Sequence, residues 1–370
     1  MKKMAQVITQ SEMGGAQKHV ILLAKEFKAR GYEIDIIAGG DGPLKKMAND
    51  IGVGYIEDPY MVREISIGKD RKNLKYLKKL FYDKKYDIVQ CHSSKAGLIA
   101  RIAAKRAHVP KIIYTAHGFV FNEPMSKIKK IIYIICEFIG ARCGDKIIAV
   151  SKKDYDSALK YKISNSKNTV FIPNAIKDID KAVLKPRKEM LSELGIDNDS
   201  FVLGNVSNFY DTKGHKYLID ALIKLSDEGF KFNAIFAGEG KNLEEMKEKC
   251  KDYDNIKFLG YRTDNYDIMN CLDLFVLPSV KEGMPYVILE AMNLGKTALC
   301  TRVGALPDII SDGDNGYLVE AQSSEQLYDK IKYIIANPDS LKAGIKGEQY
   351  VKEHFSFEKF ADAIESIYNE

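Results

Sequence analysis

Two glutamates in the stretch SVKEGMPYVILEAMNLGK (residues 279–296) have a spacing that suits the binding of hydroxyl groups on both sides of an anion. Pro285 and Gly295 predict a helix over 285–294, because proline is favoured at the first helical position and glycine just after the last one. Glu282 then lies in the turn at the start of the helix. Glu290 lies about one and a half turns into it, roughly 7–8 Å further along the axis.

The turn between the two glutamates predicts a phosphate site. Backbone amides near Gly283–Tyr286, a stretch that includes Met284 and Pro285, would face the mouth of the helix, where a diphosphate is favoured. A carboxylate accepts two hydrogen bonds side by side, as a vicinal diol requires. A nucleotide sugar carries a ribose diol on one side of its diphosphate and sugar hydroxyls on the other. Two solvated glutamates flanking a turn are the structural alternative.

Three further loops of the second half combine glycine with a cation after an apolar strand pattern. Lys213 precedes the predicted helix 214–228, Gly238 follows the strand pattern FNAIFAG, and Arg262 follows IKFLGY. The carboxyl ends of parallel strands gather at one edge of a sheet, so these loops predict one anion-binding crevice. Each residue taken alone fits an ordinary helix-capping turn or a surface cation equally well.

A glycine pair follows the first strand pattern of the chain, in TQSEMGGAQKHVILLAKEF (residues 9–27). Gly14 and Gly15 stand where the loop turns into a helix, so the backbone could approach a phosphate closely. A turn that simply requires glycine is the alternative. The dinucleotide fingerprint GxGxxG is absent.

Short apolar strand patterns alternate with helical patterns along the whole chain, which indicates parallel sheets covered by helices. The strand patterns are AQVIT, EIDIIAG, DIVQCH, KIIYTAH and KIIAVS in the first half, and FVLGNVS, FNAIFAG, IKFLGY, LDLFVLPS and TALCTRV in the second. The sequence therefore predicts an α/β protein with two doubly wound, Rossmann-like domains. We expect the domains to cover residues 1–174 and 175–354, followed by an amphipathic helix in 355–370.

Composition and charge narrow the class of protein. The chain has 370 residues, 45% of them hydrophobic, which suffices for two cores. Six scattered cysteines without a CxxC pair favour reduced thiols in a cytoplasmic protein, and the first residues lack the apolar stretch of a secretory signal. Residues 1–174 carry 32 Lys/Arg against 17 Asp/Glu, whereas residues 175–370 carry 24 against 34. Only the first half therefore suits an anionic partner.

Two basic segments account for much of this asymmetry. Residues 69–86 place leucines and a phenylalanine along one stripe among lysines, and residues 125–146 join a basic start to the run IIYII. Each could lie in the interface of an anionic membrane, or pack on the sheet as an ordinary helix. We expect packing on the core for 69–86 and membrane contact for 125–146. Nucleic acid is not expected as a partner, because no aromatic–basic interleaving accompanies the charge.

The stretch EGMPYVILE resembles the E-x7-E motif of the retaining, GT-B-fold glycosyltransferases of family four. The resemblance extends along the chain through MGGAQKH, TAHGF, DTKGH and GALPDIISDGDNGYLV, which stand in the family's order. HSSKAGLIAR (92–101) and YTAHGFVF (114–121) are similar to the subgroup that builds bacterial surface polysaccharides or glycans on lipid carriers. The resemblance implies two Rossmann-like domains with an interdomain cleft, the first binding the acceptor and the second the nucleotide sugar.

The resemblance also implies roles for single residues. Gly15 would lie near the donor phosphates and His117 near the transferred sugar. Lys213 would bind the diphosphate, Glu282 the sugar hydroxyls and Glu290 the ribose. From the residues alone, a histidine that ends a buried strand and is satisfied by the backbone is the preferred interpretation of His117.

The chain departs from the family at one candidate site residue. Asn208 stands where the family usually has an arginine, so one phosphate contact loses its charge. Arg262 and Lys216 are the cations that could supply it.

The expected enzyme transfers an N-acetylhexosamine or hexose, with retention, from a UDP-sugar to a lipid-diphosphate-linked or glycan acceptor. We expect it to need no metal, because cations and helix ends would do what a metal would do at the diphosphate. We expect it on the inner, cytoplasmic face of the cell membrane. The alternatives are a nucleotide-sugar 2-epimerase of the same fold and a non-catalytic nucleotide-sugar-binding module.

Overall fold

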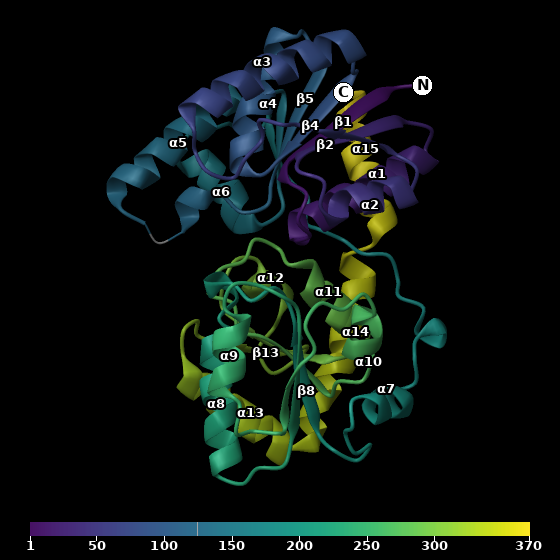
Figure 1. Cartoon of the computed structure of the whole chain (residues 1–370), viewed down its shortest axis with the longest axis vertical. Coiled ribbons are helices and arrows are strands. Elements are labelled where there is room, and N and C mark those ends of the chain that lie inside the picture. The colour runs from purple at the N-terminus through teal and green to yellow at the C-terminus, as the bar shows by residue number, and fades with distance from the viewer. Residues whose placement is uncertain (124) are drawn as a thin grey trace. The chain divides into compact units, whose positions relative to one another are not determined.

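The computed structural model describes residues 1–123 and 125–370, which form two compact α/β units (Figure 1). The first unit comprises Met1–Asn174 together with Glu358–Glu370, and the second comprises Ala175–Phe357. Each unit has its own parallel sheet and its own hydrophobic core.

The first unit is built on a seven-stranded sheet with the order β3-β2-β1-β4-β5-β6-β7, in which all the pairings are parallel. Its strands are β1 (Lys3–Gln10), β2 (Glu33–Gly39), β3 (Gly54–Glu57), β4 (Ile88–His92), β5 (Lys111–Ala116), β6 (Lys146–Ala149) and β7 (Thr169–Phe171). Its helices are α1 (Gly15–Ala29), α2 (Pro43–Asp50), α3 (Ile67–Lys84), α4 (Ser94–Arg106), the 3-10 turn η1 (Val120–Asn122), α5 (Lys127–Ala141), α6 (Lys152–Lys160) and α15 (Phe357–Asn369). The strand order reverses between β1 and β4, the kind of place where ligands bind in such sheets.

The second unit has a six-stranded parallel sheet with the order β10-β9-β8-β11-β12-β13. Its strands are β8 (Val202–Val206), β9 (Asn233–Ala237), β10 (Ile256–Phe258), β11 (Leu274–Leu277), β12 (Thr297–Thr301) and β13 (Tyr317–Val319). Its α-helices are α7 (Arg187–Glu193), α8 (His215–Asp227), α9 (Leu243–Lys249), α10 (Asn265–Asn270), α11 (Tyr286–Asn293), α12 (Leu306–Ile309), α13 (Ser324–Ala336) and α14 (Ala343–His354), with 3-10 turns η2 (Lys181–Val183), η3 (Asp211–Lys213) and η4 (Pro338–Lys342). Here the order reverses between β8 and β11, so the loops after these two strands are neighbours.

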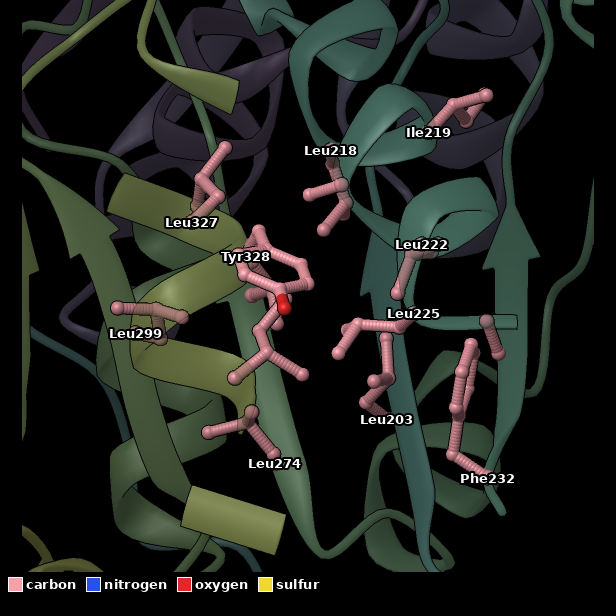
Figure 2. Close-up of a cluster of buried hydrophobic side chains, with 14 of the residues drawn as sticks. Leu203, Leu218, Ile219, Leu222, Leu225, Phe232, Leu274, Leu299, Leu327 and Tyr328 are labelled. Atoms are coloured by element: carbon pink, nitrogen blue, oxygen red, sulfur yellow. The ribbon is translucent and has the colours of Figure 1, made fainter. Parts of the chain in front are cut away.

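The core of the second unit shows why its helical patterns fold as they do. Leu218, Leu222 and Leu225 recur at helical spacing on α8 and are fully buried. They face Leu203 of β8 and Tyr328 of α13 in one cluster (Figure 2). A leucine that is fully buried contributes about 1.5–3 kcal/mol relative to an exposed one, so this stripe fixes α8 on its sheet.

All ten predicted strands are confirmed, as β1, β2, β4, β5, β6, β8, β9, β10, β11 and β12. The sequence analysis missed β3, β7 and β13, which have only three or four residues each. β3 and β7 lie at the edges of their sheet and are partly exposed, so they lack the apolar run that marks a central strand. The expected helix over 285–294 is confirmed as α11, with Pro285 just before it and Gly295 just after it at φ 76°.

The C-terminal helix α15 (yellow in Figure 1) packs in the first unit. Its Tyr368 is buried against Phe27 of α1, with 4.8 Å between the ring centroids. Glu365 accepts hydrogen bonds from Arg30 and Tyr32. The end of the chain is thus held by both apolar and polar contacts.

Candidate functional site

A lysine and a glutamate that lie 69 positions apart meet at the carboxyl ends of the neighbouring strands β8 and β11. The Nζ atom of Lys213 donates a hydrogen bond to Oε1 of Glu282 at 2.7 Å. Ser279 donates to the same oxygen at 2.6 Å. The Glu282 side chain is only 8% exposed and that of Lys213 is 25% exposed. The structure thus joins two predicted site residues, and Ser279 is a partner that the sequence analysis missed although it stands three positions before Glu282.

Glycines let the loops around this pair approach one another closely. Gly214 follows Lys213 at φ 69°, and a Cβ atom there would lie 2.0 Å from the carbonyl oxygen of Pro278. Gly238 has φ 147°, and its Cβ would lie 2.1 Å from the carbonyl oxygen of Ser207. A side chain at either glycine would push apart the loops that follow β8, β9 and β11. The loops that the prediction grouped together are thus in backbone contact with one another.

Helix α11 carries the second glutamate of the motif. Glu290 is buried, and its Oε1 atom accepts a hydrogen bond at 2.9 Å from the hydroxyl of Tyr266 on α10. Burial, and then the nearby carboxylate, raise the pKa of Tyr266, which keeps this hydroxyl protonated as a donor. Before the helix, Met284 is buried and Pro285 occupies the N-cap position. Tyr266 was not predicted, because no local spacing links it to Glu290.

The cations expected near the phosphates already have partners. Arg262 forms a bidentate contact with Asp264, in which its Nε donates at 2.8 Å, and this contact raises the pKa of the arginine. Lys216 lies 4.8 Å from the ring centre of Tyr217. The carbonyl of Asn208 accepts a hydrogen bond from the amide of Tyr210 at 2.9 Å. Asn208 is thus part of the loop against which Gly238 packs.

Gly14 and Gly15 lie at the start of α1, as predicted. A Cβ atom on Gly15 would have no atom within 4 Å, so packing does not require glycine there. The first turn of α1 contains no acidic residue, and no side chain caps its amides. This helix end is suited to an anion.

Three histidines of the first unit form a polar group at the carboxyl ends of β4 and β5. The Nε2 atom of His117 lies 3.0 Å from Nδ1 of His92, and the two rings stack with centroids 5.3 Å apart. His19 of α1 packs edge-on against His117 at 4.7 Å. His117 therefore has a side-chain partner, rather than the backbone partner that the residues alone suggested. His19 and His92 were missed, although both stand in the motifs MGGAQKH and HSSKAGLIAR.

Burial keeps these imidazoles neutral. It lowers the pKa of His19 to about 4, and it lowers the pKa values of His92 and His117 well below the ordinary value of histidine. Near neutral pH the group therefore offers lone pairs and N–H donors but no cation. The ring nitrogens of the three residues lie within 4.8 Å of one another, which makes them, among residues 1–123 and 125–370, a group that could hold a metal ion.

The two basic segments differ in the way their apolar residues are covered. On α3, Leu77 and Phe81 are buried in the core of the first unit, which confirms the expectation for 69–86. On α5, six large apolar side chains are between 40% and 73% exposed, namely Ile128, Ile131, Ile132, Ile135, Phe138 and Ile139. Among the described residues, none of the helices is both long and apolar enough to cross a bilayer.

The inner face of α5 is held by a buried ion pair. Arg101 of α4 donates to Glu137 at 2.8 Å, and both side chains are almost fully buried. The guanidinium also lies 4.0 Å from the ring centre of Tyr114, whose hydroxyl donates to Glu137 at 3.2 Å. α5 thus packs Ile134 and the Glu137 ion pair against the unit and leaves its other five isoleucines exposed, an unusually large apolar exposure for a surface helix.

Two Rossmann-like units, each with a parallel sheet, are the architecture of the GT-B fold. The chain belongs to the family 4 and group 1 glycosyltransferases. The family model described as Glycosyltransferase Family 4 matches residues 13–178, and the one described as Glycosyl transferases group 1 matches residues 186–367.

Relatives over almost the whole chain carry names from bacterial glycan synthesis. The chain is 29% identical to UDP-Gal:alpha-D-GlcNAc-diphosphoundecaprenol alpha-1,3-galactosyltransferase of Escherichia coli, over 99% of this chain and 96% of that one. It is 27% identical to the capsular polysaccharide biosynthesis glycosyltransferase CapM of Staphylococcus aureus, over 92% and 91% of the two chains. The fold matches that of Anabaena Alr3699/HepE, solved in complex with UDP-glucose, with a TM-score of 0.85 at 20% identity over 99% of both chains.

Proposed function

We propose that this glycosyltransferase moves an N-acetylhexosamine or hexose, with retention of anomeric configuration, from a UDP-sugar to a lipid-diphosphate-linked or glycan acceptor. The product would enter a surface polysaccharide. The names of the Escherichia coli and Staphylococcus aureus relatives support this acceptor class, and the complex of Alr3699/HepE with UDP-glucose supports the donor.

The contact between Lys213 and Glu282 is the observation that carries the proposal. An ammonium group has three N–H donors, and one of them is used by Glu282 Oε1. We assign the others to the leaving diphosphate. Since Oε1 of Glu282 is shared by Lys213 and Ser279, we assign the sugar hydroxyls to Oε2. One lysine then orients the sugar-binding carboxylate and neutralises the leaving group.

The other roles follow from the family pattern. Glu290 would bind the ribose diol, and the amides of Gly283 and Met284 at the start of α11 would face the diphosphate. Gly15 would lie near the phosphates, and His117 would contact the transferred sugar. The depressed pKa of His117 makes it a weak base. This suits a retaining reaction in which the leaving diphosphate itself takes the proton of the acceptor.

We further propose that the enzyme works on the cytoplasmic face of the cell membrane, with α5 as its contact. The exposed isoleucines would enter the interface, and Lys127, Lys129 and Lys130 in the first turn of the helix would meet anionic headgroups. A lipid-linked acceptor would be reached from this position.

The test supplies purified protein with a panel of UDP-, GDP-, ADP- and dTDP-sugars and an undecaprenyl-diphosphate-linked N-acetylglucosamine in vesicles. We expect an acceptor-dependent product from a UDP-sugar, with the anomeric configuration retained in its NMR spectrum. Turnover of the donor to another nucleotide sugar without any acceptor would support the 2-epimerase instead. An inverted product would overturn the retaining mechanism, and a preference for another nucleotide would overturn the UDP assignment.

A further inference from the structure

A chain of buried hydrogen bonds crosses the sheet of the first unit, from the C-terminal helix to His117. Tyr368 of α15 donates to Oε1 of Gln90 on β4. Gln6, the partner of Gln90 in the neighbouring strand β1, donates to the same oxygen at 3.2 Å. His92 lies 2.6 Å from Gln6, and His117 lies 3.0 Å from His92. All but His117 are buried, so the chain crosses a region from which water is excluded.

The direction of the hydrogen bonds at Gln6 is fixed by what its neighbours can do. Its Nε2 atom lies 3.2 Å from the sulfur of Met4 and 3.2 Å from the carbonyl oxygen of Gln90, and both of these atoms only accept. The amide nitrogen must therefore face them, and the carbonyl oxygen must face His92. An amide turned the other way would place its oxygen against the sulfur of Met4, which cannot donate, even if the amide of Gln90 turned with it.

The protons of the two histidines follow from this orientation. The carbonyl oxygen of Gln6 only accepts, so His92 donates from Nε2. His92 is buried and neutral, so its Nδ1 atom carries a lone pair. The Nε2 atom of His117, 3.0 Å away, must then carry the hydrogen that is donated to it. The remaining ring nitrogen of His117, Nδ1, is left as an acceptor.

We propose that this chain fixes the tautomer of His117, with its hydrogen on Nε2 and its lone pair on Nδ1. Gln6, Gln90, His92 and Tyr368 are then positioning residues for His117. This rests on the proposed function only in one respect, namely that His117 accepts a hydrogen bond from a hydroxyl of the transferred sugar through Nδ1. A fixed acceptor favours a donor sugar with a hydroxyl at that position over one that lacks it.

The tautomers are read from the full-length protein without any substrate. The protein contains six histidines, and their ring nitrogens can be labelled with 15N and correlated with the ring protons by NMR. The signals of His92 and His117 are assigned from His92→Gln and His117→Gln. We expect both residues near neutral pH to show a protonated Nε2 and an unprotonated Nδ1. A protonated Nδ1 on His117 would overturn the proposal on the wild-type protein alone, before any variant is made.

The role of the hydrogen-bond chain is tested with Gln6→Met, which removes the side-chain carbonyl that accepts a hydrogen bond from His92. We expect the His117 signals to report a mixture of tautomers. Transfer should fall about two- to tenfold in kcat/KM, the loss that corresponds to one neutral hydrogen bond. UDP affinity should change far less than transfer, because Lys213 and Glu290, the side chains assigned to UDP, lie in the second unit. A Gln6→Met protein that keeps a single His117 tautomer would overturn the role of the chain.

Tyr368→Phe provides a second variant, should Gln6→Met fail to fold, because it removes only the hydroxyl at the far end of the chain. Its matched control is Tyr32→Phe, which also removes a tyrosine hydroxyl that contacts α15 but lies outside the chain, since Tyr32 donates to Glu365 at 3.2 Å. We expect Tyr368→Phe, but not Tyr32→Phe, to broaden or shift the ring signals of His92 and His117. Equal effects of the two variants would reduce Tyr368 to a packing residue. If the tautomers are as expected but His117→Gln transfers sugar normally, the proposed contact with the sugar fails and the tautomer stands.

Discussion

The two groups of candidate residues differ in charge: the group in the second unit is ionised, whereas the group in the first unit is neutral. In the second unit, a nearly buried carboxylate and a partly exposed ammonium meet at 2.7 Å, and Lys213 adds positive charge at the loops that precede α11. In the first unit, three buried imidazoles are neutral, and what they offer is the direction of their hydrogen bonds. The difference suits a reaction in which a diphosphate leaves with negative charge while a neutral sugar is positioned.

The excess of basic residues in the first half of the sequence lies away from its candidate site. The first half of the sequence is strongly basic, yet its histidine group carries no charge. The second half is acidic, yet it holds the lysine assigned to the diphosphate. In the proposed membrane contact, three of these lysines (Lys127, Lys129 and Lys130) act at the exposed face of α5.

The largest expected effect is that of Lys213→Ala on binding of the diphosphate. Removing the ammonium deletes a charged contact and leaves Glu282 nearly buried without its cation, so UDP affinity should fall by about 2–5 kcal/mol, or at least roughly thirtyfold. Uridine, which has no phosphate, should lose far less. Calorimetry with both ligands measures this, with the exposed Lys247→Ala on α9 as the matched control. Equal losses of affinity for UDP and uridine would show that Lys213 does not bind the phosphates.

The second-largest expected effect is on vesicle binding, when glutamine replaces Lys127, Lys129 and Lys130. At about 1 kcal/mol per lysine near an anionic surface, binding to phosphatidylglycerol vesicles should fall roughly a hundredfold at low salt. Binding of the wild-type protein should weaken as the Debye length shortens from roughly 30 Å at about 0.01 M salt to about 10 Å at 0.1 M.

The matched control for this variant changes the same charge on α3, by glutamine at Lys69, Lys72 and Lys75, whose helix buries its apolar stripe. We expect this control to bind vesicles better than the α5 variant. Both variants should still hydrolyse free donor, since their substitutions lie on the surface of the first unit. Vesicle binding that depends neither on salt nor on the α5 lysines would contradict the proposed contact of α5 with the membrane.

Glu290→Ala should weaken UDP by about 1.5–3 kcal/mol, ten- to more than a hundredfold, because the ribose loses a charged acceptor. The ribose assignment is tested with 2′-deoxy-UDP and 2′,3′-dideoxy-UDP. The wild-type protein should discriminate against these analogues, whereas Glu290→Ala should bind all three ligands alike. Tyr266→Phe, which removes only the neutral donor to Glu290, should cost less than the alanine. A Glu290→Ala protein that still discriminates against the deoxy analogues would place the ribose elsewhere.

The neutral histidines predict a dependence of stability on pH. The folded pKa of His19 is about 4, below its ordinary value of 6.5, so the unfolded chain takes up protons first as the pH falls. The stability contributed by neutral His19 is thus complete above about pH 6.5 and is lost toward pH 4, by about 2 kcal/mol between pH 7 and 5. Urea unfolding of wild type and His19→Gln across this range measures it, and the variant should lose less. Equal slopes for the two proteins would mean that His19 is not held neutral.

The smallest expected effect is that of removing divalent metal. Since Lys213 and the start of α11 are assigned the work of neutralising the diphosphate, dialysis against EDTA should leave transfer within about twofold of the untreated rate. Adding Mg²⁺ or Mn²⁺ back should not raise it. A transfer rate that is lost with EDTA and restored by Mn²⁺ would contradict metal-independent transfer. A rate that is restored only by Zn²⁺ would indicate a metal site at the three histidines.

Much of the local structure was decided by the sequence itself. Apolar runs between turn residues predict ten strands, nine of which have a neighbouring strand on each side, because burial on both faces leaves a local signature. The bounds of α11 follow from Pro285 and Gly295 through backbone geometry alone. Gly214 and Gly238 could be placed at tight loops for the same reason. These features depend on neighbours within a few positions of the chain.

The partners of the site residues were decided only by the tertiary structure. Lys213 and Glu282 meet because β8 pairs with β11, a choice of strand order that no local pattern contains. Tyr266 reaches Glu290 from another helix for the same reason. His117 is linked to Tyr368 at the far end of the chain through side chains on two strands. The helices α3 and α5 also differ in how far their apolar residues are buried, because burial depends on what each helix packs against.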